Sequence, residues 1–388
     1  MRRPILQTPT RKSALRRAIA KPIPGLLMTV MLLPLLTRAQ QSPNFDELEN
    51  NATAAREQGD VPRALELYRQ AVELRPTWPE GWWYLGVLQY GNDAYAPAAD
   101  ALTHFIDQTP NAGPALALRG LCEFEQAQYP QSLQDLQHAI ALGAANEPRN
   151  AGIIFYHEAL LLTRLGHYEE ALAQYTTLIK HGSISEDVSA GIGLAGLRMP
   201  LLPKEIDSSQ QQMVLKVGQA AASVMNGDLT AGREAFQNLF TLFPTTPNIH
   251  YLYGYLLFTV DPTEAIAQFR RELNVSPSSA AAHSMLAWAL GMQGDFAAAL
   301  PYAKQSVAED PSLAVTQLVL GKDLVETGDV DAGLPHLEAV LKIDPQNLEA
   351  HIALAKAWSE LGRKDDARRE RLLCLTLSGK QAAPDANF

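Results

Sequence analysis

A glycine-rich hexapeptide is the first pattern in this chain that could do chemistry. Residues 191–196 read Gly-Ile-Gly-Leu-Ala-Gly, which fits the GxGxxG pattern that holds a pyrophosphate where a strand meets a helix N-terminus. The residues before it, Ile-Ser-Glu-Asp at 184–187, do not resemble a buried strand. Pro200 and Pro203 also cut short any helix that could point its amides at a phosphate. We therefore expect a flexible connector of small residues here.

Histidines recur at a fixed interval in two sets. His104 and His138 form the first set, but two histidines alone make an incomplete metal site. We therefore interpret them as solvated or packed helix residues. The second set shares one repeating position: His250, His283, Gln317 and His351. A polar ladder that responds to pH is one interpretation. The favoured one is a set of packing residues, each hydrogen-bonded to the next helix.

Two lysine–glutamate pairs recur at the same interval as His104 and His138. Lys322 precedes Glu326, and Lys356 precedes Glu360, with the spacing i, i+4 in each case. A basic pair that grips a partner's carboxylate is one interpretation. Surface pairing within each helix, worth a few tenths of a kcal/mol, is the favoured one.

Other signatures of catalysis are missing from the sequence. The chain has no P-loop, no G-x-S-x-G elbow and no paired CxxC, and His157-Glu158 is not followed by the second histidine of HExxH. We expect no enzyme activity, no cofactor and no metal site.

The N-terminal segment, residues 1–39, differs from the rest in charge and hydropathy. It carries eight basic residues and no acidic one, and without it the formal charge falls from −10 to −18. An apolar run, residues 24–36, is shorter than a membrane-spanning helix and leads to Thr37-Arg38-Ala39. This order predicts a signal peptide, 1–39, cleaved after Ala39, and a periplasmic or secreted protein. An uncleaved leader that anchors the chain in a membrane is the alternative. The acidic body argues against nucleic-acid binding.

These candidate residues are carried by amphipathic helices that repeat about every 34 residues. A small residue recurs in the first helix of each repeat: Ala52, Gly86, Gly120, Ala159, Ala220, Gly254, Ala287, Gly321 and Ala355. A second small residue follows in each partner helix: Ala64, Ala98, Ser132, Ala171, Gly232, Ala265, Ala299, Gly333 and Ala367. Further along the same repeats come six prolines, at 76, 110, 244, 277, 311 and 345. Small residues let helices approach closely, and proline ends the second helix.

In this pattern the chain resembles the tetratricopeptide repeat family. The resemblance is carried by Trp82, Leu85, Gly86, Ala98, Leu102, Phe105 and Pro110, and again by Tyr253, Gly254, Ala265, Phe269 and Pro277. Gln89 stands where the family has tyrosine. The resemblance implies an all-α fold, a right-handed superhelical solenoid of about nine helix-turn-helix repeats.

The longer of two breaks in the spacing divides the predicted solenoid into two arms. We predict a four-repeat arm at 45–185, a half-unit or hinge at 186–212, and a five-repeat arm at 213–380. A disordered tail follows at 381–388. The charged run at 363–371 predicts the polar outer face that a terminal repeat needs.

An aromatic stripe is the predicted binding site. The resemblance implies that first helices line a concave surface, so we expect eight residues there to bind a peptide: Trp83, Tyr90, Phe124, Tyr156, Tyr251, Tyr255, Phe258 and Trp288. The alternative is that these side chains bury one another, or that the extra central segment fills the groove.

The sequence therefore predicts a non-catalytic scaffold that binds a protein or peptide partner. A non-catalytic subunit of an envelope enzyme or assembly complex is the alternative. Neither a nucleic acid nor a small-molecule substrate is expected, and a membrane is expected only through an uncleaved leader.

Overall fold

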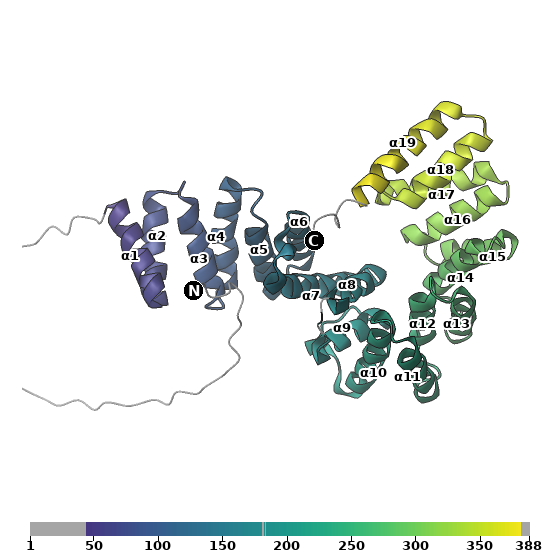
Figure 1. The fold of residues 1–388 in the computed structure, drawn as a ribbon, viewed down its shortest axis with the longest axis horizontal. Helices are drawn as coiled ribbons and strands as arrows, with labels where there is room; N and C mark the ends of the chain where they lie inside the picture. The colour runs from purple at the N-terminus through teal and green to yellow at the C-terminus, as the bar shows by residue number, and fades with distance from the viewer. Residues whose placement is uncertain (1–43, 181, 183, 382–388) are drawn as a thin grey trace, which may run out of the picture. The chain divides into compact units, whose positions relative to one another are not determined.

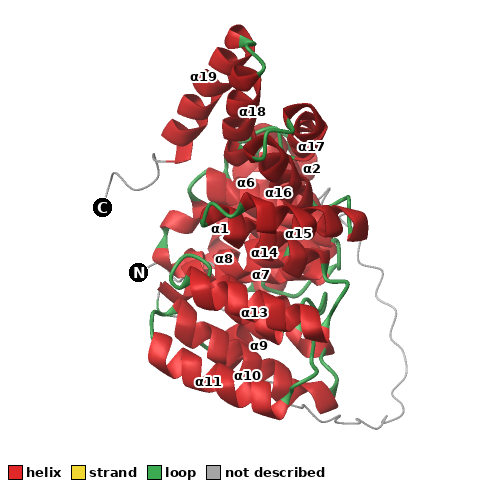
Figure 2. Cartoon of the chain, turned by 90° about the vertical axis from the view of Figure 1, so that its right-hand side faces the viewer, coloured by secondary structure: helices red, strands yellow, loops and turns green. Residues whose placement is uncertain are grey.

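The computed structural model describes residues 44–180, 182 and 184–381, and every regular element among them is a helix (Figure 2). The predicted all-α class is confirmed. The predicted signal peptide and, apart from residue 381, the predicted tail lie outside the described residues.

The described chain divides into two compact units, one ending at Leu161 and the other beginning at Leu162 (Figure 1). The first unit holds α1 (Phe45–Gln58), α2 (Val61–Leu74), α3 (Pro79–Tyr90), α4 (Tyr95–Gln108), α5 (Gly113–Glu125), α6 (Tyr129–Ala141) and η1 (Ala144–Asn146). The division falls within α7 (Pro148–Leu165), ahead of the predicted arm boundary at 186–212. Whether the predicted arms fold independently stays a prediction.

The second unit continues the helical series to the end of the described chain. Its elements are α8 (Tyr168–Lys180), α9 (Glu186–Gly196), η2 (Pro203–Glu205), α10 (Ser208–Met225), α11 (Leu229–Leu242), α12 (Ile249–Leu257), α13 (Pro262–Val275), α14 (Ala280–Met292), α15 (Phe296–Glu309), α16 (Ala314–Glu326), α17 (Val330–Ile343), α18 (Leu348–Glu360) and α19 (Lys364–Gln381).

Consecutive helices pack in pairs joined by short turns. In the first unit α1 packs on α2, α3 on α4 and α5 on α6; in the second, α12 packs on α13, α14 on α15, α16 on α17 and α18 on α19. The second helix of one pair also packs on the first helix of the next, as α15 does on α16 and α17 on α18. Stacked pairs of this kind bury one continuous core, which is the arrangement that the period of the sequence predicts.

The columns of small residues lie where paired helices touch. A Cβ atom added to Gly321 would lie 2.8 Å from the Leu337 side chain, and one added to Gly333 would lie 2.8 Å from the Gly321 carbonyl oxygen. Ser132 adapts to the same close approach by donating a 2.7 Å hydrogen bond to the carbonyl oxygen of Gly120. Larger residues would force the two helices of a repeat apart.

Several repeats turn on glycine and aspartate, and six second helices end just before a proline. Gly294 adopts a φ of +81°, which favours glycine, and Asp295 then accepts a 3.1 Å hydrogen bond from the Ala298 N–H to cap α15. The same glycine–aspartate cap precedes α2 and α11. Proline follows shortly after the end of α2, α4, α11, α13, α15 and α17.

Helix α9 is the element that does not fit a two-helix repeat, and it contains the GxGxxG pattern. A Cβ atom on Gly193 would lie 2.0 Å from the Val214 carbonyl oxygen, and one on Gly218 would lie 1.7 Å from the Ser189 carbonyl oxygen. The glycines therefore bring the backbones of α9 and α10 into direct contact. The expected flexible connector is wrong for these residues, because the glycines form a buried helix-packing surface.

Candidate functional site

Three adjoining hollows run along the C-terminal helix pairs of the second unit. One of about 300 Å³ lies against α14, α15 and α16, and one of about 750 Å³ lies between α18 and α19. A smaller hollow of about 70 Å³ shares residues with both. We call this surface the C-terminal groove and define it by Trp288, Met292, Phe296, Val319, Lys322, Asp323, Glu326, Ile352, Lys356, Glu360, Arg371 and Leu375.

The repeat itself places these side chains. Trp288, Lys322 and Lys356 each follow the small residue of a first helix, so they occupy the same position in three successive repeats. Met292, Glu326 and Glu360 occupy a second shared position, one helical turn further on. Because positions i and i+4 lie on one face of a helix, the two columns point to the same side of α14, α16 and α18.

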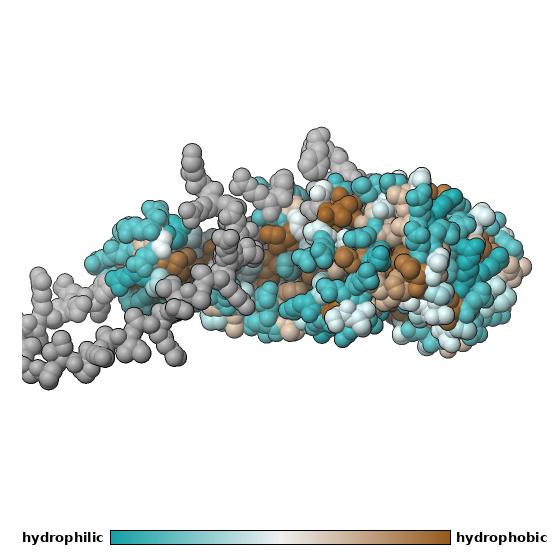
Figure 3. All heavy atoms as spheres, turned by 90° about the horizontal axis from the view of Figure 1, so that it is seen from below, coloured by the Kyte–Doolittle hydropathy of each residue, from teal (hydrophilic) through white to brown (hydrophobic). Residues whose placement is uncertain are grey.

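Apolar side chains are exposed along the groove. Met292 is 56% exposed, Ile352 is 48% exposed and Leu375 is 71% exposed. Single exposed apolar residues are common, but here they come from two of the three C-terminal helix pairs, α14–α15 and α18–α19, and line adjoining hollows. On the face of the molecule drawn in Figure 3, apolar residues likewise form separate patches among hydrophilic ones.

The groove lysines are paired with acids of neighbouring repeats. Lys322 Nζ lies 2.5 Å from Glu349 Oε2 of α18, and it also sits 5.5 Å from the centre of the Trp288 ring. Lys356 contacts Glu326 of the preceding repeat, and lies 3.7 Å from Glu360 on its own helix. Surface pairing is therefore present, but mostly between helices rather than within them. The two lysines are neutralised and do not form a free basic pair for a carboxylate.

Asp323 is the unusual ionisable group of the groove. It is only 3% exposed, and its Oδ2 atom has no hydrogen-bond partner. Burial raises the pKa of this carboxyl to about 7, with Lys322 opposing and Glu326 adding to the shift. Sequence reasoning missed Asp323, Met292 and Ile352. From the sequence, Met292 could have been found only by aligning its repeat with the next one, where it falls at the position of Glu326.

Three family models match parts of the chain that these helix pairs form. Residues 53–93 match a model described as TPR repeat, and residues 261–314 and 324–370 match models described as Tetratricopeptide repeat. Each matched stretch covers helices that pack as successive elements of the repeat stack. This chain is a tetratricopeptide-repeat protein.

Solved structures match this chain at low identity and over less than half of its length. A crystal structure of MamA is 20% identical over 42% of this chain and 96% of that chain, with a TM-score of 0.37. A MamA structure from Desulfovibrio magneticus RS-1 is 18% identical over 44% and 96%, also with a TM-score of 0.37. YrrB, described as a TPR protein with an unusual peptide-binding site, is 17% identical over 44% and 87%, again at 0.37. No curated protein matches the chain.

The first unit of this tetratricopeptide-repeat protein holds four of the predicted binding residues. Trp83, Tyr90 and Tyr156 are partly buried, and Phe124 is 8% exposed. Trp83 packs on Phe105 with ring centres 5.4 Å apart, and Tyr90 packs edge-on against Tyr95 at 5.8 Å. Phe124 belongs to the core, as the alternative of self-burial predicts, and peptide binding by the other residues stays a prediction.

The second unit holds the other four, and they differ in exposure. Tyr251 is 3% exposed, whereas Tyr255, Phe258 and Trp288 are partly buried. Phe258 and Trp288 pack edge-on with ring centres 5.9 Å apart, so the aromatic stripe meets the C-terminal groove at Trp288. Tyr251 also follows the alternative of burial within the chain.

Tyr251 is buried because it completes a polar cluster, which we call the Tyr251 junction: Tyr168, Glu169, Arg198 and Tyr251. The Tyr251 hydroxyl donates a 2.6 Å hydrogen bond to Glu169 Oε1, and Arg198 forms an ion pair with the same carboxylate. The Arg198 guanidinium lies 4.8 Å from the Tyr168 ring centre and 5.4 Å from that of Tyr251. Burial and the Glu169 charge raise the pKa of Tyr251 well above its ordinary value. The cluster has a structural role.

The recurring histidines are also structural. Nδ1 of His250 lies 2.6 Å from Gln268, that of His283 lies 2.8 Å from Glu309, and that of His351 lies 2.6 Å from Glu370. In each case the partner is on the second helix of the same repeat, which confirms the favoured interpretation. His104 stacks on Trp82, with ring centres 4.2 Å apart.

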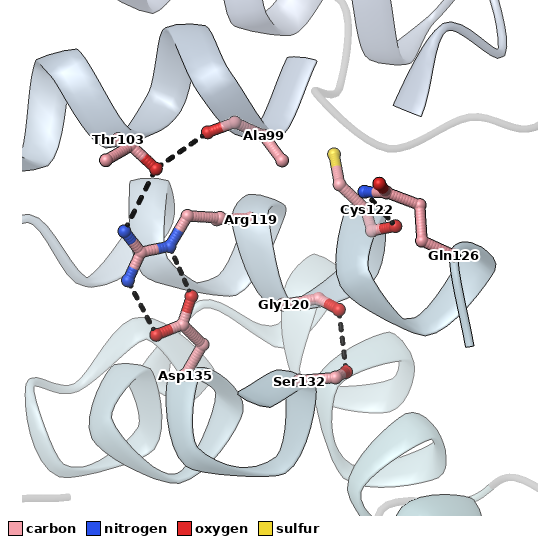
Figure 4. Close-up of polar contacts among 8 residues, drawn as sticks. All are labelled: Ala99, Thr103, Arg119, Gly120, Cys122, Gln126, Ser132 and Asp135. Atoms are coloured by element: carbon pink, nitrogen blue, oxygen red, sulfur yellow. Dashed lines mark hydrogen bonds and ion pairs between the residues drawn. The ribbon is translucent and has the colours of Figure 1, made fainter. Parts of the chain in front are cut away.

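An ion pair inside the first unit has the same structural character (Figure 4). Arg119 Nε and Nη2 donate to the two carboxylate oxygens of Asp135 at 2.6 and 2.8 Å, and Nη1 donates to Thr103 at 3.2 Å. Nearby, burial raises the pKa of Glu123 to about 7, with Asp135 adding to the shift and Arg119 opposing it. These contacts join α4, α5 and α6.

Two further classes of site are absent from the described residues. No group of three or more histidine, cysteine, aspartate or glutamate residues in residues 44–180, 182 and 184–381 could hold a metal ion. Over the same part of the chain, no helix combines the length and apolar character needed to cross a membrane.

Proposed function

We propose that this protein is a non-catalytic interaction scaffold, and that its C-terminal groove binds a peptide segment of a partner protein. One observation carries the proposal: Met292, Ile352 and Leu375 expose apolar surface along adjoining hollows of the repeat stack. Exposed apolar side chains along adjoining hollows form the kind of surface that an extended or helical segment recognises.

The shape of the groove favours a polypeptide over a small molecule. Its hollows follow one another across several helices, whereas a small-molecule site is usually one enclosed pocket. The charged side chains on its rim are already paired, as between Lys356 and Glu326, so they favour neither phosphate nor nucleic acid.

We further propose that the protein acts outside the cytoplasm, after cleavage behind Ala39. The proposal rests on the basic, apolar and small-residue regions of residues 1–39, which occur in secretory order. Intact-mass analysis of the exported protein should give Gln40, or its cyclised form, as the first residue. Recovery of the full-length chain from membranes would support the anchored alternative instead.

Peptide display tests the groove. A random peptide library is selected on the natural chain, and the enriched peptides are then measured against Ile352→Glu and Leu242→Glu. Leu242 is 57% exposed on α11, away from the groove residues, so it matches Ile352 in chemistry and exposure.

We expect Ile352→Glu to weaken the enriched peptides at least about tenfold and Leu242→Glu to leave them unchanged, because losing a central apolar anchor often costs more than about 1.4 kcal/mol. Peptides that bind the natural chain and Ile352→Glu equally would contradict the proposed site. Failure to enrich any peptide would count against peptide binding itself and favour a role as a subunit docked by a larger surface.

A further inference from the structure

The hollow against α14 and α16 ends on a buried carboxyl group. Asp323 is only 3% exposed, and its Oδ2 atom has no hydrogen-bond partner. Its Oδ1 atom lies 3.3 Å from the position that a Cβ atom on Gly291 would occupy. The carboxyl therefore packs against the α14 backbone at Gly291, which has no side chain. An unpaired buried carboxyl is costly, so its presence in a binding hollow points to a missing partner.

The walls of the same hollow are apolar and aromatic. Met292, Phe296 and Val319 supply aliphatic and aromatic surface, and Trp288 supplies an indole ring. Lys322 Nζ already lies 5.5 Å from the centre of this ring, so a cation can approach it. An apolar wall with a carboxyl at its end matches a side chain that has a methylene stem and a cationic tip.

The charges around the hollow disfavour an anionic ligand, and the unpaired carboxyl disfavours an apolar one. An anionic ligand would meet Asp323 and Glu326, while Lys322 and Lys356 are held by Glu349 and Glu326. An apolar side chain would leave Asp323 without a partner. The body of the protein beyond residue 39 carries a formal charge of −18, which attracts basic partners over longer distances.

We propose that the hollow formed by Trp288, Met292, Phe296 and Asp323 receives a lysine or arginine side chain of the bound peptide. The stem packs on Met292 and Phe296, the cation lies at the Trp288 ring, and its N–H groups donate to the Asp323 carboxylate. The inference rests on the proposed peptide binding and adds the chemical class of the partner: a segment with at least one basic residue.

Four small probes test the assignment on the full mature chain: the N-acetyl amides of arginine, lysine, citrulline and norleucine. Citrulline keeps the shape of arginine without its charge. Binding is followed through the Trp288 indole N–H signal in NMR spectra, which is assigned by its loss in Trp288→Phe. We expect arginine or lysine amide to bind at least about tenfold more tightly than citrulline or norleucine amide, because an ionised partner strengthens the hydrogen bond to a carboxylate.

Two variants test whether Asp323 is the carboxyl that binds the basic probes. Asp323→Asn should weaken the basic probes at least about fivefold, because the amide keeps the size but loses the charge. Asp331→Asn, an exposed position at the start of α17, should leave binding unchanged. Citrulline binding as well as arginine on the natural chain would overturn the inference without relying on any variant. Equal binding by Asp323→Asn and the natural chain would also overturn it.

These outcomes are separable from those of the proposed function. Display peptides that need Ile352 but contain no basic residue, together with no preference for the basic probes, would overturn this inference and leave peptide binding standing. Display peptides enriched in lysine or arginine that lose affinity on Asp323→Asn would support both.

Discussion

The Tyr251 junction and the C-terminal groove are two regions of the same unit, and they use similar residues in opposite ways. At the junction, Tyr251, Glu169 and Arg198 satisfy one another, and Tyr251 is buried. In the groove, Trp288 stays partly exposed and Asp323 has a carboxylate oxygen without a partner. The comparison teaches that an aromatic residue on a first helix becomes core or binding surface according to what packs over it.

The largest effect is expected for a substitution in the Tyr251 junction. Tyr251→Ala removes a buried ring and leaves Glu169 without its hydroxyl donor, so we expect a loss of about 3–5 kcal/mol in unfolding free energy. Chemical denaturation followed by circular dichroism measures it. Tyr251→Phe keeps the ring and should lose only about 1 kcal/mol. A loss below about 1 kcal/mol for the alanine variant would show that the junction is not closed.

The glycine contact between α9 and α10 should give the next largest effect. Gly218→Ala places a Cβ atom 1.7 Å from the Ser189 carbonyl oxygen, so α9 and α10 must separate. We expect a loss of about 2–3 kcal/mol and faster proteolysis near α9. Gly152→Ala in α7 is the control, because a Cβ atom there meets nothing within 4 Å. Equal stability of the two variants would support a loose connector after all.

The pH dependence of stability tests the unpaired carboxyl of the C-terminal groove. The pKa of Asp323 is about 7 in the folded chain, against an ordinary 3.8. At pH values between 3.8 and about 7, Asp323 has lost its proton in the unfolded chain but still holds it in the folded chain. This carboxyl therefore lowers stability progressively as pH rises from about 4 to about 7, and the penalty is constant above that.

Asp323→Asn removes this penalty. We expect it to be more stable than the natural chain by on the order of 2 kcal/mol at pH 8, and by less at pH 5. Denaturation at the two pH values measures the difference, with Asp331→Asn as the control for net charge. A difference that does not change with pH would contradict a raised pKa for Asp323. A variant that gains stability while losing the basic probes would mark Asp323 as a residue kept for binding.

The smallest expected effect is that of Trp288→Ala. Trp288 packs on Phe258 but remains partly exposed, so its truncation should lose about 1 kcal/mol of stability. The same denaturation experiment measures it beside Tyr251→Ala. A loss as large as that of Tyr251→Ala would show that the groove is buried, and would remove the contrast between the two regions.

The sequence by itself determined the repeat. Its period, the paired small residues such as Gly321 and Gly333, and the prolines after the second helices follow from local rules: close helices need small side chains, and proline ends a helix. These features recur along the chain, so they can be recognised without knowing how the repeats stack. The histidine column was interpreted correctly for the same reason, since each partner lies within the same repeat.

Only the tertiary structure decided the exposure of the aromatic stripe and the role of the glycines in α9. Tyr251 is covered because Glu169 and Arg198, both distant in sequence, meet it, and no periodic pattern encodes that meeting. Gly193 packs on Val214 of the following helix, where the sequence alone suggested a flexible connector. The Asp323 carboxyl likewise became a candidate ligand for a cation only once the packing of α14 and α16 removed it from water. Burial depends on contacts between segments far apart in the chain, and local sequence rules do not contain those contacts.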